Sequence, residues 1–231
     1  MLLSWQQIPS TVITEILCNI DFDGIVIDTE HGFFNLDQLF NAIQVAKLCN
    51  KICFVRLTKV EKAQIRKCLD AGCDGLIFSM IETIEQADRV YKHTRYPEFG
   101  GSRGLGLIRQ NTWGIDEKLV KSPPIVIAQI ETEKGVLNLQ KIYNENIFDF
   151  FMIGPYDLSS SLGIPGDFKN TKYIKCIKNI EKIVGFEKMA VHVPNNVANE
   201  VKKYANYKIK ALGMDTTFII EKYKELKNVK F

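Results

Sequence analysis

The sequence lacks the features that would mark an exported or membrane-spanning protein. No apolar run approaches the ~20 residues that cross a bilayer. The first ten residues, MLLSWQQIPS, show no basic region followed by an apolar stretch, so no signal peptide is expected. None of the six cysteines falls in a CxxC pair, and no histidine lies at zinc-finger spacing. We therefore expect free, buried thiols in a reducing cytoplasm.

The chain also has little net charge and no sign of a domain boundary. Its formal charge is +3, and many lysines stand beside glutamates, as in Glu181-Lys182 and Glu221-Lys222. This pattern is typical of solvated helix faces and disfavours a nucleic-acid patch. There is no linker, repeat or low-complexity tract, so we expect one domain over residues 1–231, long enough for a sizeable core.

Short β-branched runs alternate with longer amphipathic stretches along the whole chain. Such alternation predicts parallel βαβ units, and eight strands fit a closed (β/α)₈ TIM barrel better than an open sheet. The expected strands are Leu2–Trp5, Gly24–Asp28, Ile52–Leu57, Gly75–Met80, Ile125–Glu131, Phe148–Gly154, Met189–Val193 and Ile209–Gly213. Expected helices include Leu36–Leu48, Lys62–Ala71, Ile84–His93, Asn138–Tyr143, Asn195–Tyr204 and Phe218–Leu226.

Two connections between these elements are long, 96–124 and 155–185, and the second contains a helix of its own. Long loops in a compact barrel are usually functional. The glycine cluster Gly100–Gly106 does not follow a strand and open a helix, so it is no dinucleotide fingerprint. We interpret it as a flexible active-site loop in which Arg103 contacts an anion.

Polar side chains gather where the expected strands end. In such barrels the carboxyl ends of the strands face the active site, while the amino ends stabilise the fold. The residues at these ends are Asp28, Thr29, Glu30 and His31, Arg56, Gln129 and Glu131, Gly154, Tyr156 and Asp157, His192, and Asp215.

Gln129 and Glu131 lie two residues apart on one strand and so share a face among apolar neighbours. A buried carboxylate needs a partner. Glu131 and Asp157, on adjacent strands, offer two hard oxygens that suit Mg²⁺ or Mn²⁺ completed by water and substrate. The alternative is a salt bridge from Glu131 to Arg56 or a lysine.

Asp28 and His31 lie three residues apart, and an imidazole held by a carboxylate is a natural general base. The alternative is a structural histidine. Arg56 would face a substrate carboxylate or an enolate oxygen, unless it forms an internal pair with Glu30 or Glu131. His93 is expected on an exposed helix face, and His192, which has no evident partner, stays open between structure and substrate contact.

Taken together, these segments resemble the HpcH/HpaI-type class II pyruvate aldolases of the phosphoenolpyruvate/pyruvate barrel superfamily. The resemblance spans nearly the whole chain, in the family's order and spacing. It is carried by FDGIVIDTEHG at 22–32, CFVRL at 53–57, LDAGCDGLIFSMIETIEQA at 69–87, RYPEFGGSRGLG at 95–106, AQIETEKG at 128–135, FFMIGPYDLSSSLG at 150–163 and ALGMDTTFI at 211–219.

The resemblance implies a role for each matching residue. His31 corresponds to the base with Asp28 beside it, and Arg56 to the residue that stabilises the enolate. Glu131 and Asp157 correspond to the metal ligands. The other matches are Gln129 as a substrate contact, Gly154 and Tyr156 in the loop that meets the pyruvate carboxylate, and Asp70 as an acid that reaches the histidine region from a neighbouring subunit.

Three features depart from the family pattern. The chain lacks the leading helix common in the family, Ser79 stands where the family usually has proline, and His192 is not a family feature. The first two bear on barrel closure and pocket shape. None of them touches the metal and base residues.

The expected function is that of a metal-dependent aldolase, a carbon–carbon lyase that forms or cleaves 4-hydroxy-2-oxo acids through a metal-bound pyruvate enolate. Lys188 and Lys208 stand at strand starts and Lys210 in mid-strand, so a Schiff-base aldolase is disfavoured. The alternatives are a citryl-CoA-type or phosphonopyruvate-type lyase on the same barrel, and a non-catalytic metal-binding relative.

The expected cofactor is a divalent metal: Mg²⁺, Mn²⁺ or Co²⁺. The expected partners are pyruvate and an aldehyde, or their aldol, and further copies of the chain in a homo-oligomer, with a hexamer favoured. No nucleic-acid or membrane partner is expected. The sequence does not name the aldehyde, because loop side chains shape its pocket.

Overall fold

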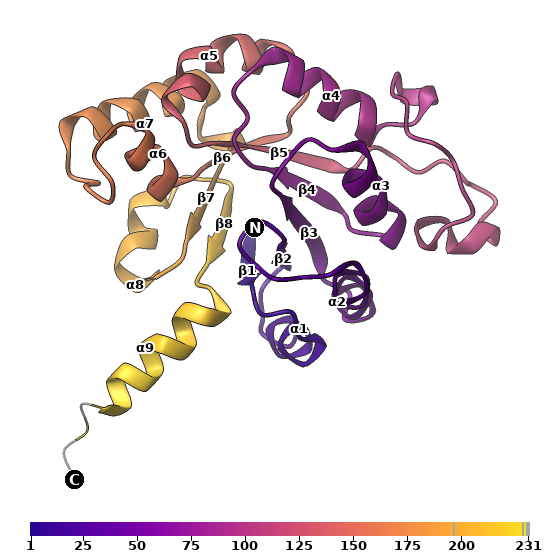
Figure 1. Ribbon diagram of the computed structural model, residues 1–231, viewed down its shortest axis with the longest axis horizontal. Helices are drawn as coiled ribbons and strands as arrows, with labels where there is room; N and C mark the ends of the chain where they lie inside the picture. The colour runs from indigo at the N-terminus through magenta and orange to yellow at the C-terminus, as the bar shows by residue number, and fades with distance from the viewer. Residues whose placement is uncertain (196, 228, 230–231) are drawn as a thin grey trace.

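Eight parallel strands close into a barrel surrounded by helices (Figure 1). The computed structural model describes residues 1–195, 197–227 and 229. Strand order follows the sequence, and β8 pairs with β1 through Leu2↔Lys210 and Leu3↔Ala211, which confirms the predicted TIM barrel. The strands are β1 (Leu2–Gln6), β2 (Gly24–Asp28), β3 (Ile52–Leu57), β4 (Gly75–Phe78), β5 (Ile125–Ile130), β6 (Phe150–Ile153), β7 (Met189–Val193) and β8 (Ile209–Leu212).

The helices lie between successive strands and pack on the outside of the barrel (Figure 1). Short 3₁₀ turns accompany them within the described residues: Pro97–Phe99, Arg109–Gly114, Phe186–Lys188 and Val201–Tyr204. The α-helices are α1 (Thr11–Cys18), α2 (Leu36–Leu48), α3 (Lys62–Ala71), α4 (Ile84–Thr94), α5 (Glu133–Asn144), α6 (Pro155–Ser161), α7 (Thr171–Val184), α8 (Val197–Glu200) and α9 (Asp215–Lys227).

Two apolar layers arise from the alternation of side chains along each strand. Inward-pointing residues such as Leu3, Val26 and Phe54 fill the barrel, with Ile127 and Met152 across from them. Their neighbours in sequence point outward and pack under the amphipathic helices. Because both faces of every strand are buried, the strands read as continuous apolar runs.

The observed elements refine the predicted boundaries. Helices α1 and α6 were not among the expected ones, and α6 begins on a proline at its first position. The stretch 195–204 was expected to be one helix. It forms the short α8 followed by a 3₁₀ turn, and residue 196 lies outside the described residues.

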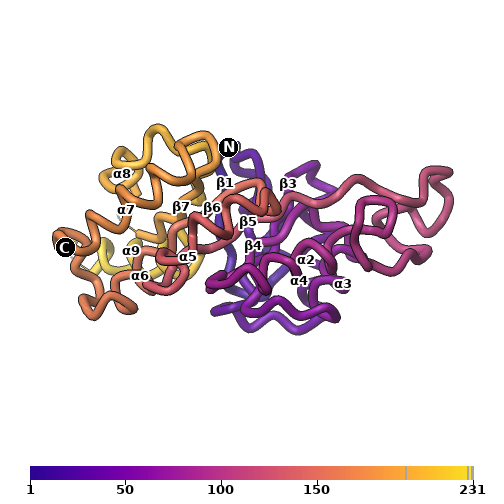
Figure 2. The backbone as a smooth tube through the Cα atoms, turned by 90° about the horizontal axis from the view of Figure 1, so that it is seen from above, coloured from indigo at the N-terminus to yellow at the C-terminus, as the bar shows by residue number. Residues whose placement is uncertain are grey.

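The long connection between α4 and β5, 95–124, lies at the amino end of the strands. A helix that follows a strand returns the chain to the opposite end of the barrel, so the segment after α4 must lead into the start of β5. It projects beyond the barrel (Figure 2). The expectation that Gly100–Gly106 forms an active-site loop of its own chain is therefore wrong.

Three further features concern the last helix, the cysteines and the apolar character of the helices. Helix α9 extends away from the barrel (Figure 1) and exposes Phe218, Ile219, Ile220, Tyr223 and Leu226. All six cysteines are free, and four of them are buried. Within the described residues, no helix combines the length and apolar character that crossing a membrane requires.

Candidate active site

The alternation of inward and outward side chains along each strand, which builds the barrel core, also positions the site. One step beyond the inward-pointing apolar residues, each strand presents its next inward residue at the carboxyl end of the barrel. At this end the inward residues are polar, or glycine in one case. This layer comprises Gln7 after β1, Asp28, Arg56, Ser79 after β4, Gln129, Gly154 after β6, and His192.

Asp28 and Arg56 are paired in register between β2 and β3, and their side chains form a buried bidentate ion pair. Arg56 Nε lies 2.8 Å from Asp28 Oδ1, and Nη2 lies 2.5 Å from Oδ2. The Nη1 atom of Arg56 is 2.9 Å from Glu30 Oε2. These contacts use three of the five N–H groups of a guanidinium, so two can still meet a ligand.

The environment of Asp28 favours its charged form. Burial alone would raise the pKa of Asp28, but the hydrogen bonds and charge of Arg56, together with the amide of Gln7, outweigh it and lower this pKa to about 2. The indole of Trp5 donates a further bond of 3.2 Å, and the Arg56 guanidinium lies over the Trp5 ring. Asp28 is therefore a fixed anion that orients Arg56.

The prediction that Asp28 holds the imidazole of His31 needs correction. Asp28 Oδ1 accepts the backbone N–H of His31 at 3.3 Å and that of Glu30 at 3.0 Å, so it shapes the turn after β2. The carboxylate is instead satisfied by Arg56, its neighbour in register. The His31 side chain is exposed in the single chain and stands at the rim of the site. Arg56 likewise makes the internal pair with Glu30 that was its alternative, while it also lines the cavity.

Glu131 is a buried carboxylate at the end of β5. Oε1 accepts the Met80 N–H at 2.7 Å, and Met80 adopts a left-handed backbone (φ 52°) in doing so. Oε2 accepts from the Gln129 amide. Burial, followed by the neighbouring Glu30 and Asp157 charges, raises the pKa of Glu131 to about 7 even though the Met80 bond lowers it.

Most of the predicted residues line one cavity of about 400 Å³ at the carboxyl end of the barrel. Glu131 lies directly behind its wall: a Cβ built on Gly154 would come within 2.3 Å of Glu131 Oε2, so only glycine lets the strand pass this carboxylate. Asp157, in the first turn of α6, is exposed to the cavity. The cavity brings together His31, Arg56, Gln129, Gly154, Tyr156, Asp157 and His192.

The donor set fits a hard divalent cation. Gln129 Oε1 is buried and has no hydrogen-bond partner within the described residues, and the Glu131 carboxylate beside it lacks a buried cation of its own. An oxygen-binding ion would satisfy both. No group of three or more His, Cys, Asp or Glu side chains poised for a metal occurs in the described part of the chain.

Three predicted residues lie elsewhere. Asp70 is near the end of α3, at the amino end of the barrel, where it pairs with Arg66 (3.3 Å) and Arg103 (3.0 Å). Arg103 is buried over the Tyr96 ring. The acid that it contacts is Asp70 of its own chain, and it does not line the cavity of the site. His93 is half-buried with Nδ1 unpaired within the described residues, which corrects its expected exposure.

Reasoning from sequence missed the contribution of β1. Gln7 donates to Asp28, and its backbone N–H and that of Ile8 donate to the Asp215 carboxylate, which closes the barrel between β8 and β1. Ser79 donates to Glu30 Oε2 at 2.6 Å, so this departure from the family pattern adds a bond to the Arg56 network. Two glutamines directly after the expected first strand, Gln6 and Gln7, were the available signal.

Comparison with known proteins agrees with this geometry. The model of the HpcH/HpaI aldolase/citrate lyase family matches residues 3–221. The chain belongs to this family. A 2-keto-3-deoxy-L-rhamnonate aldolase from Salmonella gallinarum is 32% identical over 70% of the chain, and the match spans 62% of that relative's length. One of the same name from Shigella dysenteriae is 29% identical over 92% of the chain and 82% of its own length.

Solved structures share the fold of this chain. An HpcH/HpaI aldolase/citrate lyase family protein from Burkholderia cenocepacia superposes with a TM-score of 0.89 at 23% identity, over 98% of this chain and 92% of that one. A structure described as citrate synthase SbnG gives 0.83 at 27% identity, over 97% and 90%. The likeness to these structures therefore extends over the whole barrel.

Proposed function

We propose that the chain is a metal-dependent aldolase that joins pyruvate to an aldehyde, or cleaves the resulting 4-hydroxy-2-oxo acid. The observation that carries the proposal is the convergence of His31, Arg56, Gln129 and Asp157 on one cavity, with the Glu131 carboxylate behind it. The aldolases among its relatives support the same class of reaction.

Glu131 and Asp157 would hold the metal. The buried, unpaired Gln129 Oε1 and the raised pKa of Glu131 are the features expected of a site that awaits a cation. When bound, a Mg²⁺, Mn²⁺ or Co²⁺ ion supplies Lewis-acid polarisation of the keto group and charge neutralisation for the enolate.

The side chains of the chain itself orient and protonate the substrate. Arg56, fixed by Asp28 and Glu30, directs its two remaining N–H groups toward the developing enolate oxygen. In cleavage, His31 takes the proton of the 4-hydroxyl group. The C3–C4 bond then breaks, which releases the aldehyde and leaves its electron pair on the pyruvate enolate. His31, directly or through a water molecule, then returns a proton to C3 and completes pyruvate; the reverse of this step exchanges the methyl protons.

A related carbon–carbon bond reaction is the second candidate. The 27% identity to a protein described as a citrate synthase favours it, because that likeness extends over nearly the whole chain. Such an enzyme would act on a different donor or acceptor and leave the methyl protons of pyruvate alone.

We further propose a homo-oligomer, favouring a hexamer, that acts in the cytoplasm. The apolar side chains of α9 and of the 95–124 connection, among them Ile219 and Ile115, are exposed in the single chain and would be covered by neighbours. Asp70 would approach the exposed His31 of a neighbouring subunit. The free cysteines support a reducing compartment.

The deciding experiment needs only pyruvate. Purified protein with Mg²⁺ or Mn²⁺ in D₂O should exchange the pyruvate methyl protons faster than the metal alone, as followed by NMR. His31→Ala should slow this exchange by roughly 10²–10⁴-fold, the usual contribution of a positioned general base. Because some enzymes deprotonate pyruvate only with aldehyde bound, the assay is repeated with glycolaldehyde, lactaldehyde and succinic semialdehyde. If folded, metal-loaded protein shows no exchange of the pyruvate methyl protons either without or with an aldehyde, the aldolase proposal is wrong.

Metal dependence is tested separately. Exhaustive chelation should abolish exchange, and Mg²⁺, Mn²⁺ or Co²⁺ should restore it. Glu131→Ala should prevent restoration, whereas Glu98→Ala, in the projecting connection, should not. Full activity after chelation, or trapping of pyruvate on a lysine by borohydride, would contradict a metal-dependent mechanism.

A further inference from the structure

A second cavity of about 280 Å³ adjoins the proposed active site. The two share a wall made of Pro155, Tyr156, His192, Pro194 and Asn195. We call the cavity of the proposed active site the inner cavity. A molecule anchored there can extend past this wall into the second cavity. We call the second cavity the outer pocket. It is lined beyond the shared wall by Phe168, Tyr173, Val193, Glu200, Lys203 and Tyr204.

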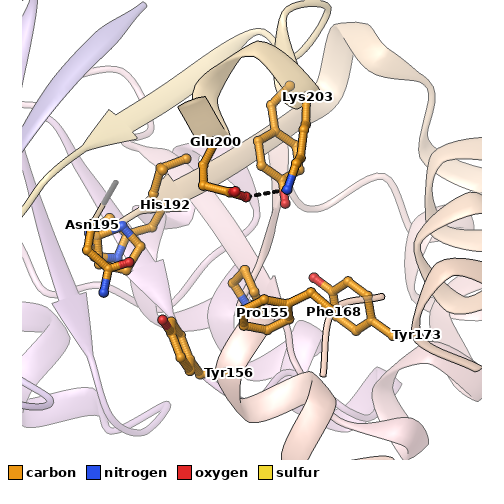
Figure 3. Close-up of a pocket in the computed structure, with 11 residues that line it drawn as sticks. Pro155, Tyr156, Phe168, Tyr173, His192, Asn195, Glu200 and Lys203 are labelled. Carbon is orange, nitrogen blue, oxygen red and sulfur yellow. Dashed lines mark hydrogen bonds and ion pairs between the residues drawn. The ribbon is translucent and has the colours of Figure 1, made fainter. Parts of the chain in front are cut away.

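The outer pocket has aromatic walls with a polar group directed inward. Tyr156 and Phe168 meet edge to face at 5.2 Å between ring centroids, and Phe168 lies 5.4 Å from Tyr173. Tyr173 is 5% exposed, and its hydroxyl interacts with that of Tyr204, which lines the same pocket. Figure 3 shows this hydroxyl turned toward the middle of the pocket. Two hydroxyls that bond one another use only one of their two O–H groups, so the other remains a donor for a ligand.

The charges at the outer pocket cancel one another. Lys203 Nζ lies 2.6 Å from Glu200 Oε2, one turn away along the chain (Figure 3). Among the described lining residues, Lys203 is the one lysine or arginine. A ligand that ends in a carboxylate would have to compete with Glu200 for this ammonium. A ligand that carries hydroxyl groups would meet no such competition.

His192 stands where the two cavities meet. Its ring stacks on Trp5 at 3.8 Å between centroids, and Nε2 lies 3.1 Å from the Gly213 carbonyl. Facing a carbonyl, Nε2 must carry the proton, which leaves Nδ1 as an acceptor in the neutral ring. Burial lowers the pKa of His192 to about 3, so the neutral form prevails. A hydroxyl on the substrate chain is the group that this acceptor fits.

We infer that the outer pocket is the subsite for the aldehyde-derived half of the substrate and takes an uncharged, hydroxylated carbon chain in preference to one that ends in a carboxylate. The inference rests on the proposed function, since it presumes that pyruvate occupies the inner cavity. Tyr173 and His192 supply the polar contacts, and the rings of Tyr156 and Phe168 cover the carbon skeleton.

The test compares two aldehydes, glyceraldehyde and succinic semialdehyde, in aldol addition to pyruvate with Mg²⁺. Wild-type protein should show the higher kcat/KM with glyceraldehyde. Tyr173→Phe removes one of the two pocket hydroxyls and should lower kcat/KM for glyceraldehyde by about 3–10-fold, mainly through KM, as loss of one neutral hydrogen bond does. The matched control is Tyr143→Phe, on α5 outside both cavities, which should leave the ratio of the two kcat/KM values unchanged.

A gain-of-function variant tests the charge argument. Glu200→Gln frees Lys203 and should raise kcat/KM for succinic semialdehyde by about 3–5-fold, the scale of an exposed ion pair. Its control is Asp88→Asn, which breaks the comparable Lys92 pair on α4 and should leave the aldehyde ratio unchanged.

The outcomes separate the two proposals. Absence of pyruvate exchange and of aldol addition in the wild type defeats the proposed function itself. If the wild type is active but prefers succinic semialdehyde, the outer-pocket inference is overturned. The same holds if neither Tyr173→Phe nor Glu200→Gln moves the aldehyde ratio beyond its control.

Discussion

The Arg56 guanidinium neutralises Asp28 and Glu30 and also lines the proposed active site. Arg56→Ala leaves two carboxylates without their cation, and we expect it to lower the free energy of unfolding by about 3–5 kcal/mol. Arg56→Lys restores one charge but not the planar fork. It should fold more stably than the alanine variant and yet lose on the order of 10²-fold or more in pyruvate exchange, by analogy with loss of an oxyanion donor.

Urea unfolding and the D₂O exchange assay measure the two effects separately. Lys92→Ala, which removes an exposed cation on α4, serves as the control for both. Near-normal exchange in a folded Arg56→Ala protein would reduce Arg56 to an internal ion pair.

His192 makes stability depend on pH. Its pKa is about 3 in the folded chain and about 6.5 when unfolded, so the unfolded state binds the extra proton as pH falls. The stabilisation from a neutral His192 is full above about pH 6.5 and is lost as pH falls toward 3. Between about pH 7 and pH 5 the loss should be on the order of 2 kcal/mol.

His192→Phe keeps a ring against Trp5 and removes the titration, so the loss should disappear in this variant. Glu131 acts in the opposite sense, because a raised carboxyl pKa stabilises the folded state at low pH. Only the difference between wild type and His192→Phe therefore isolates His192. Equal pH dependence of urea unfolding in the two proteins would contradict the prediction.

Among individual residues, the alternation of side chains along the strands made it predictable that four face inward: Asp28, Arg56, Gln129 and Glu131. Their partners were not predictable. Asp28 meets Arg56 because β2 and β3 pair in that register, and register is fixed by the packing of the whole barrel. The neighbour in sequence, His31, offers only its backbone N–H to the carboxylate.

The junction of β6 and α6 places glycine against the candidate metal ligand. A Cβ at residue 154 would lie 2.3 Å from Glu131 Oε2 and 2.8 Å from Gln129 Nε2, so Gly154→Ala must displace both side chains. We expect metal affinity, measured by calorimetry with Mn²⁺, to fall by about 10–100-fold, as when groups that orient a ligand are lost.

The control for this substitution is Gly104→Ala, whose added methyl would meet open space. It should bind Mn²⁺ like the wild type. Unchanged affinity in Gly154→Ala would mean that Glu131 is not a ligand.

Element types were predicted well where amphipathic or β-branched runs are long, and poorly where elements are short. Helices α1 and α6 escaped because seven or eight residues give little periodicity. Length and glycine content alone predict an active-site loop for the connection 95–124, and that prediction is wrong. The direction of the chain, from the end of α4 to the start of β5, sends it to the other end of the barrel.

The whole molecule leaves apolar surface uncovered. Helix α9 places Ile219, Tyr223 and Leu226 at helical spacing on one side, each 45% or more exposed. Sequence alone could not distinguish this helix from one packed on its own barrel, since both show the same amphipathic pattern. A surface of this kind is typical of an interface between subunits.

The mass of the protein in solution tests that interface. Light scattering should give the wild-type protein a mass several times that of one chain. Ile219→Ser combined with Tyr223→Ser should shift it toward smaller species, because both side chains lose their apolar contacts without a change in net charge. Lys222→Ser with Glu225→Ser removes an exposed ion pair from the same helix without removing an apolar side chain, and it should leave the mass unchanged.

The activity of the dissociated protein then tests the role of Asp70. If Asp70 serves the His31 of a neighbour, Asp70→Asn should slow pyruvate exchange in the intact oligomer. It should add nothing to the α9 double variant, because the neighbour is already gone. Additive losses would show that Asp70 acts within its own chain through Arg103, and a fully active wild-type monomer would remove the interface role from both α9 and Asp70.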